Sequence, residues 1–129
     1  MGVSTVTATR VYSVGVGGDL VMDKFPYTAL SRTYSSDSIT ADSAPTMTAL
    51  MTGFNTNAGV LGLDETTEFD DFNGDGDGQR LRTLLEQAKG RGMRAGVVST
   101  ARITHATPAA TFAHINIAGY PLRPLEELP

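Results

Sequence analysis

Residues 79–116 alternate a helical pattern, a short apolar run and a second helical pattern, and this order limits the folds open to the chain. Apolar residues recur at helical spacing over 79–89, which indicates an amphipathic helix; they are Leu81, Leu84, Leu85 and Ala88. Residues 95–99, Ala-Gly-Val-Val-Ser, are typical of a buried parallel strand. Thr107, followed by proline, predicts the cap of a helix over 109–116. This order of helices and strands predicts an α/β layer in which strands pair in parallel.

A further helix start lies in the first half of the chain. Asp42 and Ser43 are residues that cap helices, and Pro45 falls in the first turn, where its missing N–H leaves no hydrogen bond unmade. We therefore expect a helix over 46–52, ended by Gly53.

The segments before that helix predict strands on propensity. Residues 3–14 and 27–34 alternate β-branched or aromatic residues with polar ones, and branched side chains lose rotamer freedom in a helix. Glycines over 15–18 separate the two segments. Propensity therefore favours two extended elements here.

Composition excludes several classes of protein. The chain has 129 residues and a mass of 13.6 kDa, which is room for one domain. Lys and Arg total 10 against 14 Asp and Glu, and this acidic balance argues against a nucleic-acid partner. The absence of cysteine excludes disulfides and thiolate chemistry, and two histidines argue against a self-contained zinc site. No apolar run approaches the roughly 20 residues of a transmembrane segment.

Ser43 is the strongest candidate for chemistry. A serine at the start of a helix lies where backbone N–H groups and the helix dipole favour an anion, and such a site suits phosphate. The alternative is that Asp42 or Ser43 only caps the helix, which is the commonest use of these residues.

Two further features suggest a ligand. Residues 71–77, Asp-Phe-Asn-Gly-Asp-Gly-Asp, match the first half of a calcium loop, but its twelfth position is Arg82 instead of glutamate; a solvated acidic loop is the alternative. His105 follows the predicted strand over 95–99, and ligands collect at such strand ends in open α/β sheets. The alternative for His105 is a hydrogen-bonded surface residue. His114, inside the last predicted helix, is interpreted as structural.

Three segments in register resemble the alkaline phosphatase family. They are residues 40–53 (TADSAPTMTALMTG), 57–62 (NAGVLG) and 97–114 (VVSTARITHATPAATFAH). The resemblance covers a core over 1–116 and leaves a divergent proline-rich tail over 117–129. It implies an α/β fold, a partial three-layer α/β/α sandwich with an incomplete central sheet. It also makes residues 4–14 a helix, and we follow it there because tertiary packing often overrides propensity.

The resemblance further implies a phosphomonoester hydrolase with two zinc ions and one magnesium ion. Ser43 matches the nucleophile, which coordinates one zinc and forms a phosphoserine intermediate. Asp42 matches the residue that orients the substrate-binding arginine. Thr107 matches a magnesium ligand, and His105 matches a position near that ion that usually acts through water. Metal coordination is needed because a serine hydroxyl is a poor nucleophile at neutral pH.

The chain also departs from the family pattern. The family's first strand, with its metal-bridging aspartate, would precede Met1, and the substrate arginine is expected at Ala118. The remaining zinc ligands belong to a C-terminal half that the chain lacks. We therefore expect a truncated form with weak or no activity and an exposed sheet edge that favours self-association. The family is usually exported, whereas residues 1–8 show no features of a signal peptide.

Two other functions stay open. One is a non-catalytic fragment that binds surfaces or partner chains through apolar and acidic patches. The other is a metal-free esterase that pairs Ser43 with His105 or His114, which requires a serine–histidine hydrogen bond and an oxyanion hole. Activity on phosphate and carboxylic esters, with and without chelator, separates these possibilities.

Overall fold

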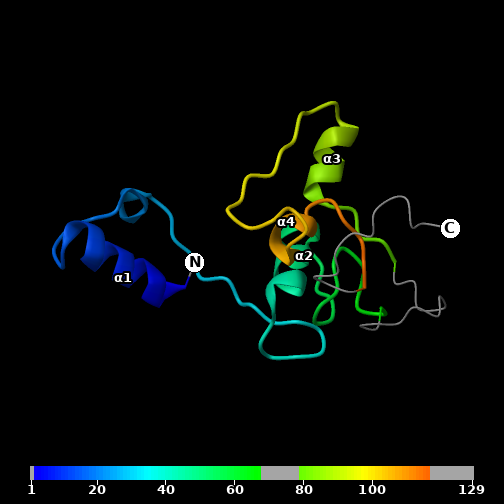
Figure 1. The fold of residues 1–129 in the computed structure, drawn as a ribbon, viewed down its shortest axis with the longest axis horizontal. Coiled ribbons are helices and arrows are strands. Elements are labelled where there is room, and N and C mark those ends of the chain that lie inside the picture. Colours follow the sequence, from blue (N-terminus) through cyan, green and yellow to red (C-terminus); the bar gives the residue numbers. More distant parts are fainter. Residues whose placement is uncertain (1, 68–78, 117–129) are drawn as a thin grey trace. The chain divides into compact units, whose positions relative to one another are not determined.

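The structure, a computed structural model, describes residues 2–67 and 79–116. The chain divides into two compact units, residues 1–32 and residues 33–129. The first unit holds an α-helix and a 3-10 helix, α1 (Val3–Val14) and η1 (Val21–Lys24) (Figure 1). The second unit holds three α-helices, α2 (Ser43–Thr52), α3 (Leu84–Gly90) and α4 (Ala106–Ala109).

Helix α1 forms although its sequence is rich in β-branched residues. The hydroxyl groups of Thr7 and Thr9 each donate to the carbonyl oxygen four residues earlier, at 3.0 and 2.8 Å, so these side chains bond to the helix that carries them. No residue of α1 is buried within the structure described. The helix expected from the resemblance is confirmed, and the strand expected over 3–14 from propensity is wrong.

An ion pair joins the two helices of the first unit. The guanidinium of Arg10 donates from Nε and Nη2 to the two carboxylate oxygens of Asp23, at 2.8 and 2.6 Å. The backbone N–H of Leu20 also donates to Asp23, at 2.8 Å. The hydrogen bond from Arg10 and that from Leu20 lower the pKa of Asp23 to about 2. This bidentate pair therefore links η1 to α1.

The strands expected over 27–34 and 95–99 do not form. Within residues 2–67 and 79–116, β-pairing is confined to isolated antiparallel bridges, which are Ser35–Ser38, Leu61–Ile115 and Leu63–Arg80. Residues 94–98 have no regular secondary structure, and Val98 is fully exposed. The N–H groups of these residues have no backbone partner in the described part of the chain. A buried parallel strand needs neighbours on both sides, and the described residues supply none.

Helix α2 matches its predicted limits closely. Asp42 is its N-cap, as expected of a capping residue before a helix. Gly53 ends it in the left-handed conformation, with φ of 84°, and its N–H donates to the carbonyl of Ala49. The helix thus has both of the boundaries that the sequence indicated.

Helices α3 and α4 are shorter than predicted. Helix α3 begins only at Leu84, because Thr83 is its N-cap and exchanges hydrogen bonds with Glu86. Helix α4 begins at Ala106 with His105 as N-cap, so the prediction that Thr107 caps a helix over 109–116 is wrong. After α4, Ile115 pairs with Leu61 and the helix does not continue.

The core of the second unit is built mostly from small side chains. One buried hydrophobic cluster comprises Ala44, Leu61, Ala106, Ala109 and Ala110. Helix α2 contacts both α3 and α4, and Figure 1 shows α2 and α4 side by side. Small side chains let backbones approach closely, so backbone hydrogen bonds can fix the relative positions of these elements.

Several predictions lie outside the described residues. They are the calcium loop over 71–77 and the tail over 117–129, and the domain boundary expected at 116 stays a prediction. Among the residues that the structure describes, no helix has the length and apolar character needed to cross a membrane.

Candidate functional site

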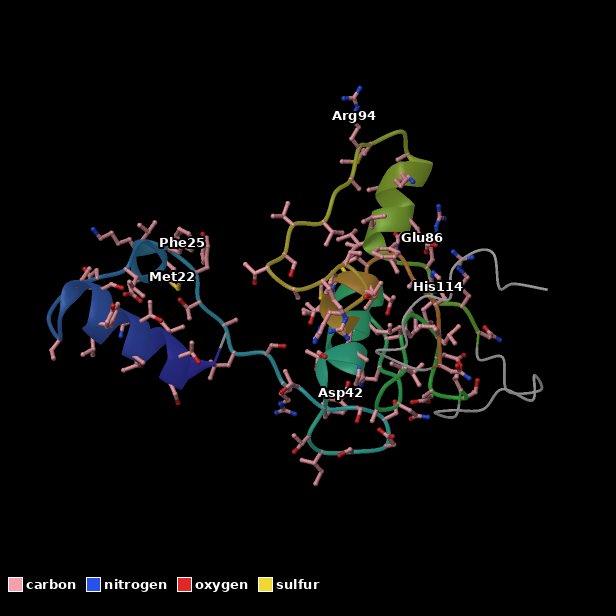
Figure 2. All side chains as sticks on the ribbon, in the orientation of Figure 1. Met22, Phe25, Asp42, Glu86, Arg94 and His114 are labelled. Atoms are coloured by element: carbon pink, nitrogen blue, oxygen red, sulfur yellow. The ribbon has the colours of Figure 1, made fainter. Side chains whose placement is uncertain are left out.

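The N-terminal end of α2 presents Ser43 as the first residue of the helix. Asp42 engages both carboxylate oxygens there: Oδ1 accepts from the N–H of Ala44 at 2.8 Å, and Oδ2 accepts from the N–H of Gly59 at 3.1 Å. Figure 2 shows Asp42 at this end of α2. Ser43 is exposed, and its hydroxyl makes no hydrogen bond with any described residue. An unengaged hydroxyl thus lies at the positive end of a helix dipole.

A turn over residues 57–62, called here the 57–62 turn, packs against that helix end. Asp37 accepts from the N–H of Ala58 at 3.0 and 3.1 Å. Hydrogen bonds from Ser35 and then from the Ala58 N–H lower the pKa of Asp37, although burial opposes the shift. Two carboxylates, Asp37 and Asp42, therefore hold consecutive N–H groups of the turn.

Gly62 ends the turn at a position that only glycine suits. Its N–H donates to the hydroxyl of Thr48 on α2 at 3.0 Å, and its carbonyl lies 2.7 Å from Nδ1 of His114. Its φ is +63°, and an added Cβ would lie 2.5 Å from the carbonyl oxygen of Ala113. The turn is thus fixed between α2 on one side and the segment after α4 on the other.

His105 and Thr107 lie at the start of α4, against the same core as Ser43. Ala106, which stands between them, belongs to the cluster that contains Ala44, the neighbour of Ser43. Thr107 is exposed, whereas Nδ1 of His105 is buried and has no hydrogen-bond partner among the described residues. The structure therefore brings the two helix ends to one core, and no hydrogen bond joins Ser43 to His105 or Thr107 in the described part of the chain.

The metal-ligating capacity of these residues is limited. Among residues 2–67 and 79–116, no three His, Cys, Asp or Glu side chains gather in a way that could hold a metal ion. The hydroxyl oxygens of Ser43 and Thr107 are ligands of the kind that a hard cation takes, whereas the imidazole of His105 suits softer ions such as zinc. The described residues do not assemble a zinc site by themselves.

A second polar cluster joins α3 to the 57–62 turn, and sequence reasoning did not foresee it. Oε1 of Glu86 lies 3.2 Å from Nε2 of His114 and also accepts a hydrogen bond from Arg80. Figure 2 shows Glu86 and His114 near each other. Desolvation raises the pKa of Glu86, but hydrogen bonds from Thr83, Arg80 and His114 together lower it to about 2.

His114 follows α4 instead of lying inside a helix, and its hydrogen bonds agree with the structural role expected for it. One signal in the sequence pointed toward the cluster. Thr83 and Glu86 have the spacing of a capping box, which places Glu86 at the start of α3.

Comparisons with known proteins agree on one family. A family model described as alkaline phosphatase matches residues 1–119. The chain is 43% identical over 122 residues to alkaline phosphatase 4 of Drosophila melanogaster. The matched region covers 89% of this chain and 20% of that protein. It is 42% identical over 120 residues to the tissue-nonspecific alkaline phosphatase isozyme of Homo sapiens, and this matched region covers 88% of this chain and 23% of that protein.

Solved structures show the same likeness. The alkaline phosphatase from the Antarctic bacterium TAB5 superposes with a TM-score of 0.77 and 28% identity, over 92% of this chain and 31% of that one. A cold-active alkaline phosphatase from the psychrophile Shewanella sp. superposes with a TM-score of 0.76 and 30% identity, over 93% of this chain and 29% of that one. The chain thus spans less than a third of the length of these relatives. The expected fold class, an incomplete α/β sandwich of this type, is confirmed.

Proposed function

The chain belongs to the alkaline phosphatase family, and from this membership we propose that it carries the nucleophile of a phosphomonoester hydrolase at Ser43. The observation that supports this role is the unengaged hydroxyl of Ser43 at the start of α2, a helix of 10 residues. Asp42 accepts from the N–H of Ala44, and Pro45 has no N–H, so the N–H of Ser43 is the one that remains in this first turn for a phosphoryl oxygen. The substrate class is a phosphate monoester.

The proposed reaction proceeds in two displacements at phosphorus. The Ser43 oxygen forms a bond to phosphorus as the bond to the ester oxygen breaks, which gives phosphoserine and an alcohol. Water then displaces the serine oxygen and releases inorganic phosphate. No described side chain is hydrogen-bonded to Ser43 to take its proton, so the chain's own residues supply position more than activation.

Thr107 and His105 are the residues that would hold a magnesium ion. The exposed hydroxyl oxygen of Thr107 supports this assignment, because Mg²⁺ prefers oxygen ligands, and the resemblance implies that His105 acts through water. Forms of the TAB5 alkaline phosphatase in which one histidine is replaced by aspartate or glutamate are described with Mg bound in the M3 site. A bound cation lowers the pKa of a coordinated hydroxyl or water and stabilises a leaving oxygen. The zinc ions that the family implies lack a complete ligand set among the described residues.

Asp42 acts in this proposal as a positioning residue. Its two hydrogen bonds, to Ala44 and to Gly59, attach the start of α2 to the 57–62 turn and so orient Ser43. The arginine that the resemblance places beside Asp42 would fall at Ala118, outside the described residues. The orientation of Ser43 is therefore the part of the role that the contacts of Asp42 support.

We propose that the chain by itself has weak or no phosphatase activity. Removal of one preorganised group that stabilises the transition state costs about 10²–10³ in rate, and the described residues lack most metal ligands. Hydrolysis of p-nitrophenyl phosphate with zinc and magnesium tests this, with the TAB5 enzyme assayed in parallel. Turnover at the rate of that enzyme would contradict the proposal.

A chimaera tests the role of Ser43 separately. Residues 1–116 of this chain replace the matching residues of the TAB5 enzyme, so that the rest of the fold is supplied and the position of Ala118 keeps the residue of that enzyme. We expect metal-dependent activity that Ser43→Ala lowers by about a thousandfold or more, whereas Ser31→Ala, an exposed serine in the first unit, leaves it unchanged. Equal activity of the two variants would show that Ser43 is not the nucleophile.

The exposed segment 93–99 favours a second function, association with another polypeptide. Met93 and Val98 are exposed. The N–H groups of 94–98 have no backbone partner among residues 2–67 and 79–116, and in this they resemble those of a sheet edge. We propose self-association through this segment. Sedimentation analysis is expected to show that Val98→Lys lowers the associated fraction, whereas Ile39→Lys, in an exposed loop, does not. Equal association of both variants would contradict it.

A metal-free esterase is not proposed. Its mechanism requires a histidine hydrogen-bonded to Ser43. The ring of His114 bonds to Gly62 and Glu86 instead, and Nδ1 of His105 has no partner among the described residues.

A further inference from the structure

We propose that residues 94–98, called here the 94–98 segment, are a cleavage site for a serine endopeptidase of trypsin-like specificity, which cuts between Arg94 and Ala95 and leaves the two pieces assembled. In this reaction the peptide bond breaks as water adds a hydroxyl group to the carbonyl carbon of Arg94 and a hydrogen to the nitrogen of Ala95. The inference rests on the backbone between α3 and α4 and not on the proposed phosphatase activity.

The backbone of the 94–98 segment is free to pair with another protein. Within residues 2–67 and 79–116, none of its N–H or carbonyl groups takes part in a hydrogen bond, and it has no regular secondary structure. Four of its five residues are exposed, and Val97 is half-buried. An extended peptide binds an edge strand of a partner through such backbone groups, and exposed segments of this kind are where proteases cut folded proteins. The segment therefore offers itself without the unfolding of any other element.

Both ends of the 94–98 segment are attached to the rest of the second unit. Before it, the N–H of Met93 donates to the carbonyl of Ala88 at 3.0 Å, at the end of α3. After it, the N–H of His105 donates to the carbonyl of Arg102 at 2.9 Å, and α4 begins with the buried Ala106. Figure 1 shows the chain leave α3 and reach α4 as one long loop, drawn in yellow. The segment is thus exposed in the folded chain.

Arg94 supplies the side chain that such an enzyme recognises. Arg94 is exposed, and its guanidinium makes no hydrogen bond or ion pair with a described residue. Figure 2 shows the side chain of Arg94 pointing away from the ribbon. The specificity pocket of a trypsin-like enzyme contains an aspartate, which pairs with the guanidinium of the residue before the cut. Ala95 and Gly96, which follow the cut, are small and exposed, so they leave room for the enzyme.

The other basic residues in the described part of the second unit adjoin peptide groups that are already bonded; they are Arg80, Arg82, Lys89, Arg91 and Arg102. The N–H groups after Arg80 and Arg82 donate to Gly62 and Glu86, at 2.8 and 3.0 Å. One bond of 3.0 Å, from the N–H of Gly92 to the carbonyl of Lys89, engages the peptides that follow both Lys89 and Arg91. The carbonyl of Arg102 accepts from His105. Only the peptide after Arg94 is free on both sides among these described residues.

The contacts between the two pieces lie outside the 94–98 segment. Ala44, in the first piece, shares a buried cluster with Ala106, in the second. Leu61 and Ile115 exchange two backbone hydrogen bonds of 2.8 Å, and these also join the two pieces. The cut removes no hydrogen bond of the described residues, since the segment makes none. The nicked chain is therefore expected to remain one folded particle.

Limited digestion of the full chain with trypsin tests this proposal without substrate or metal. The chain is diluted until sedimentation shows a monomer, and the fragments are identified by mass spectrometry. Within residues 33–116, we expect the cut after Arg94 to be faster than any other by about tenfold or more, because the other peptides must first open. Cuts after Arg32, in the exposed link between the two units, are scored separately. The two fragments that meet at the cut are expected to elute together in size-exclusion chromatography and to separate in urea.

Variants show whether the free backbone, and not the arginine alone, directs the cut. Arg94→Gln is expected to remove the first cut in residues 33–116, whereas Arg91→Gln is expected to leave it. In the Arg94→Gln chain, Val98→Arg is expected to restore rapid cleavage, now after position 98. The matched control is Leu50→Arg in the same background, because Leu50 is 66% exposed but lies within α2. A faster first cut elsewhere in residues 33–116, equal cleavage at positions 50 and 98, or separation of the two fragments without urea would overturn the proposal.

Discussion

The first unit and the core around α2 hold their helices in different ways. In the first unit, α1 has no buried residue, and its support comes from its own threonine hydroxyls and from the ion pair between Arg10 and Asp23. In the second unit, α2 meets α4 over a buried core and shares hydrogen bonds with the 57–62 turn.

The difference teaches what a site needs beyond secondary structure. A helix can form from local bonds, but a side chain such as Ser43 is positioned only when the end of its helix is attached to other elements. Asp42 and Thr48 make that attachment through backbone N–H groups of Gly59 and Gly62. The following predictions test whether these tertiary bonds, and not the helices alone, hold the second unit together.

The largest effect is expected from Gly62→Ala. The added Cβ would lie 2.5 Å from the carbonyl oxygen of Ala113 at a φ of +63°, so both a clash and backbone strain arise. We expect a loss of about 3 kcal/mol or more in the free energy of unfolding, measured with urea. Gly53→Ala is the matched control: its φ is +84° but no atom lies within 4 Å, so about 1 kcal/mol is expected. Equal losses would contradict this view of the turn.

Asp42→Ala is expected to have the next largest effect. It removes the N-cap of α2 and the acceptor for Gly59 together, at a cost of about 2 kcal/mol in the free energy of unfolding. Asp42→Asn keeps one acceptor oxygen, and roughly half of that loss is expected. Calorimetry measures both variants; an alanine variant as stable as the parent chain would show that the cap contributes nothing.

Acid is expected to weaken the contact of α3 through Glu86. The pKa of Glu86 in the folded chain is about 2, below its ordinary value of 4.5, so the folded state favours the ionised form. This stability is therefore present above pH 4.5 and is lost as the pH falls toward 2. We expect a loss of about 1–2 kcal/mol over this range, because the carboxylate is partly solvated. Urea unfolding at several pH values checks this, and Glu86→Gln should flatten the profile; a parallel profile would contradict it.

The smallest effect is expected in the first unit, from Asp23→Asn. The pKa of Asp23 is lowered to about 2, so its pair with Arg10 contributes above the ordinary pKa of 3.8 and is lost as the pH falls through about 2. Because the pair is exposed to solvent, we expect only a small fall in helicity, measured by circular dichroism of residues 1–32 as a peptide and in the full chain. Complete loss of the helical signal of residues 1–32 after Asp23→Asn would contradict the view that this pair contributes little.

The parts of the fold that the sequence predicted are those set by local chemistry. The limits of α2 followed from Asp42 and Gly53, because a cap and a left-handed glycine act within one turn. The strand expected over 95–99 failed for the opposite reason, since a strand exists only with partners that lie elsewhere. Helix α1 was identified by resemblance and not by propensity.

The candidate site was predictable only as a set of residues. The motifs pointed to Ser43, His105 and Thr107, and the structure adds that the flanking Ala44 and Ala106 share one core. The link between Glu86 and His114 spans 28 positions of the sequence, and no local pattern reports such a contact. Whether Ser43 and Asp42 act as proposed depends on the chemistry tests above.

Hydrogen exchange of the backbone amides in the full chain tests the comparison most directly. We expect the slowest exchange at Leu61, Gly62 and Ile115, where the turn meets α2 and the segment after α4. The amides of α1 are expected to exchange much faster, and those of 94–98 at nearly unprotected rates. Protection in α1 equal to that of the 57–62 turn would contradict the claim that tertiary backbone bonds set the order around Ser43.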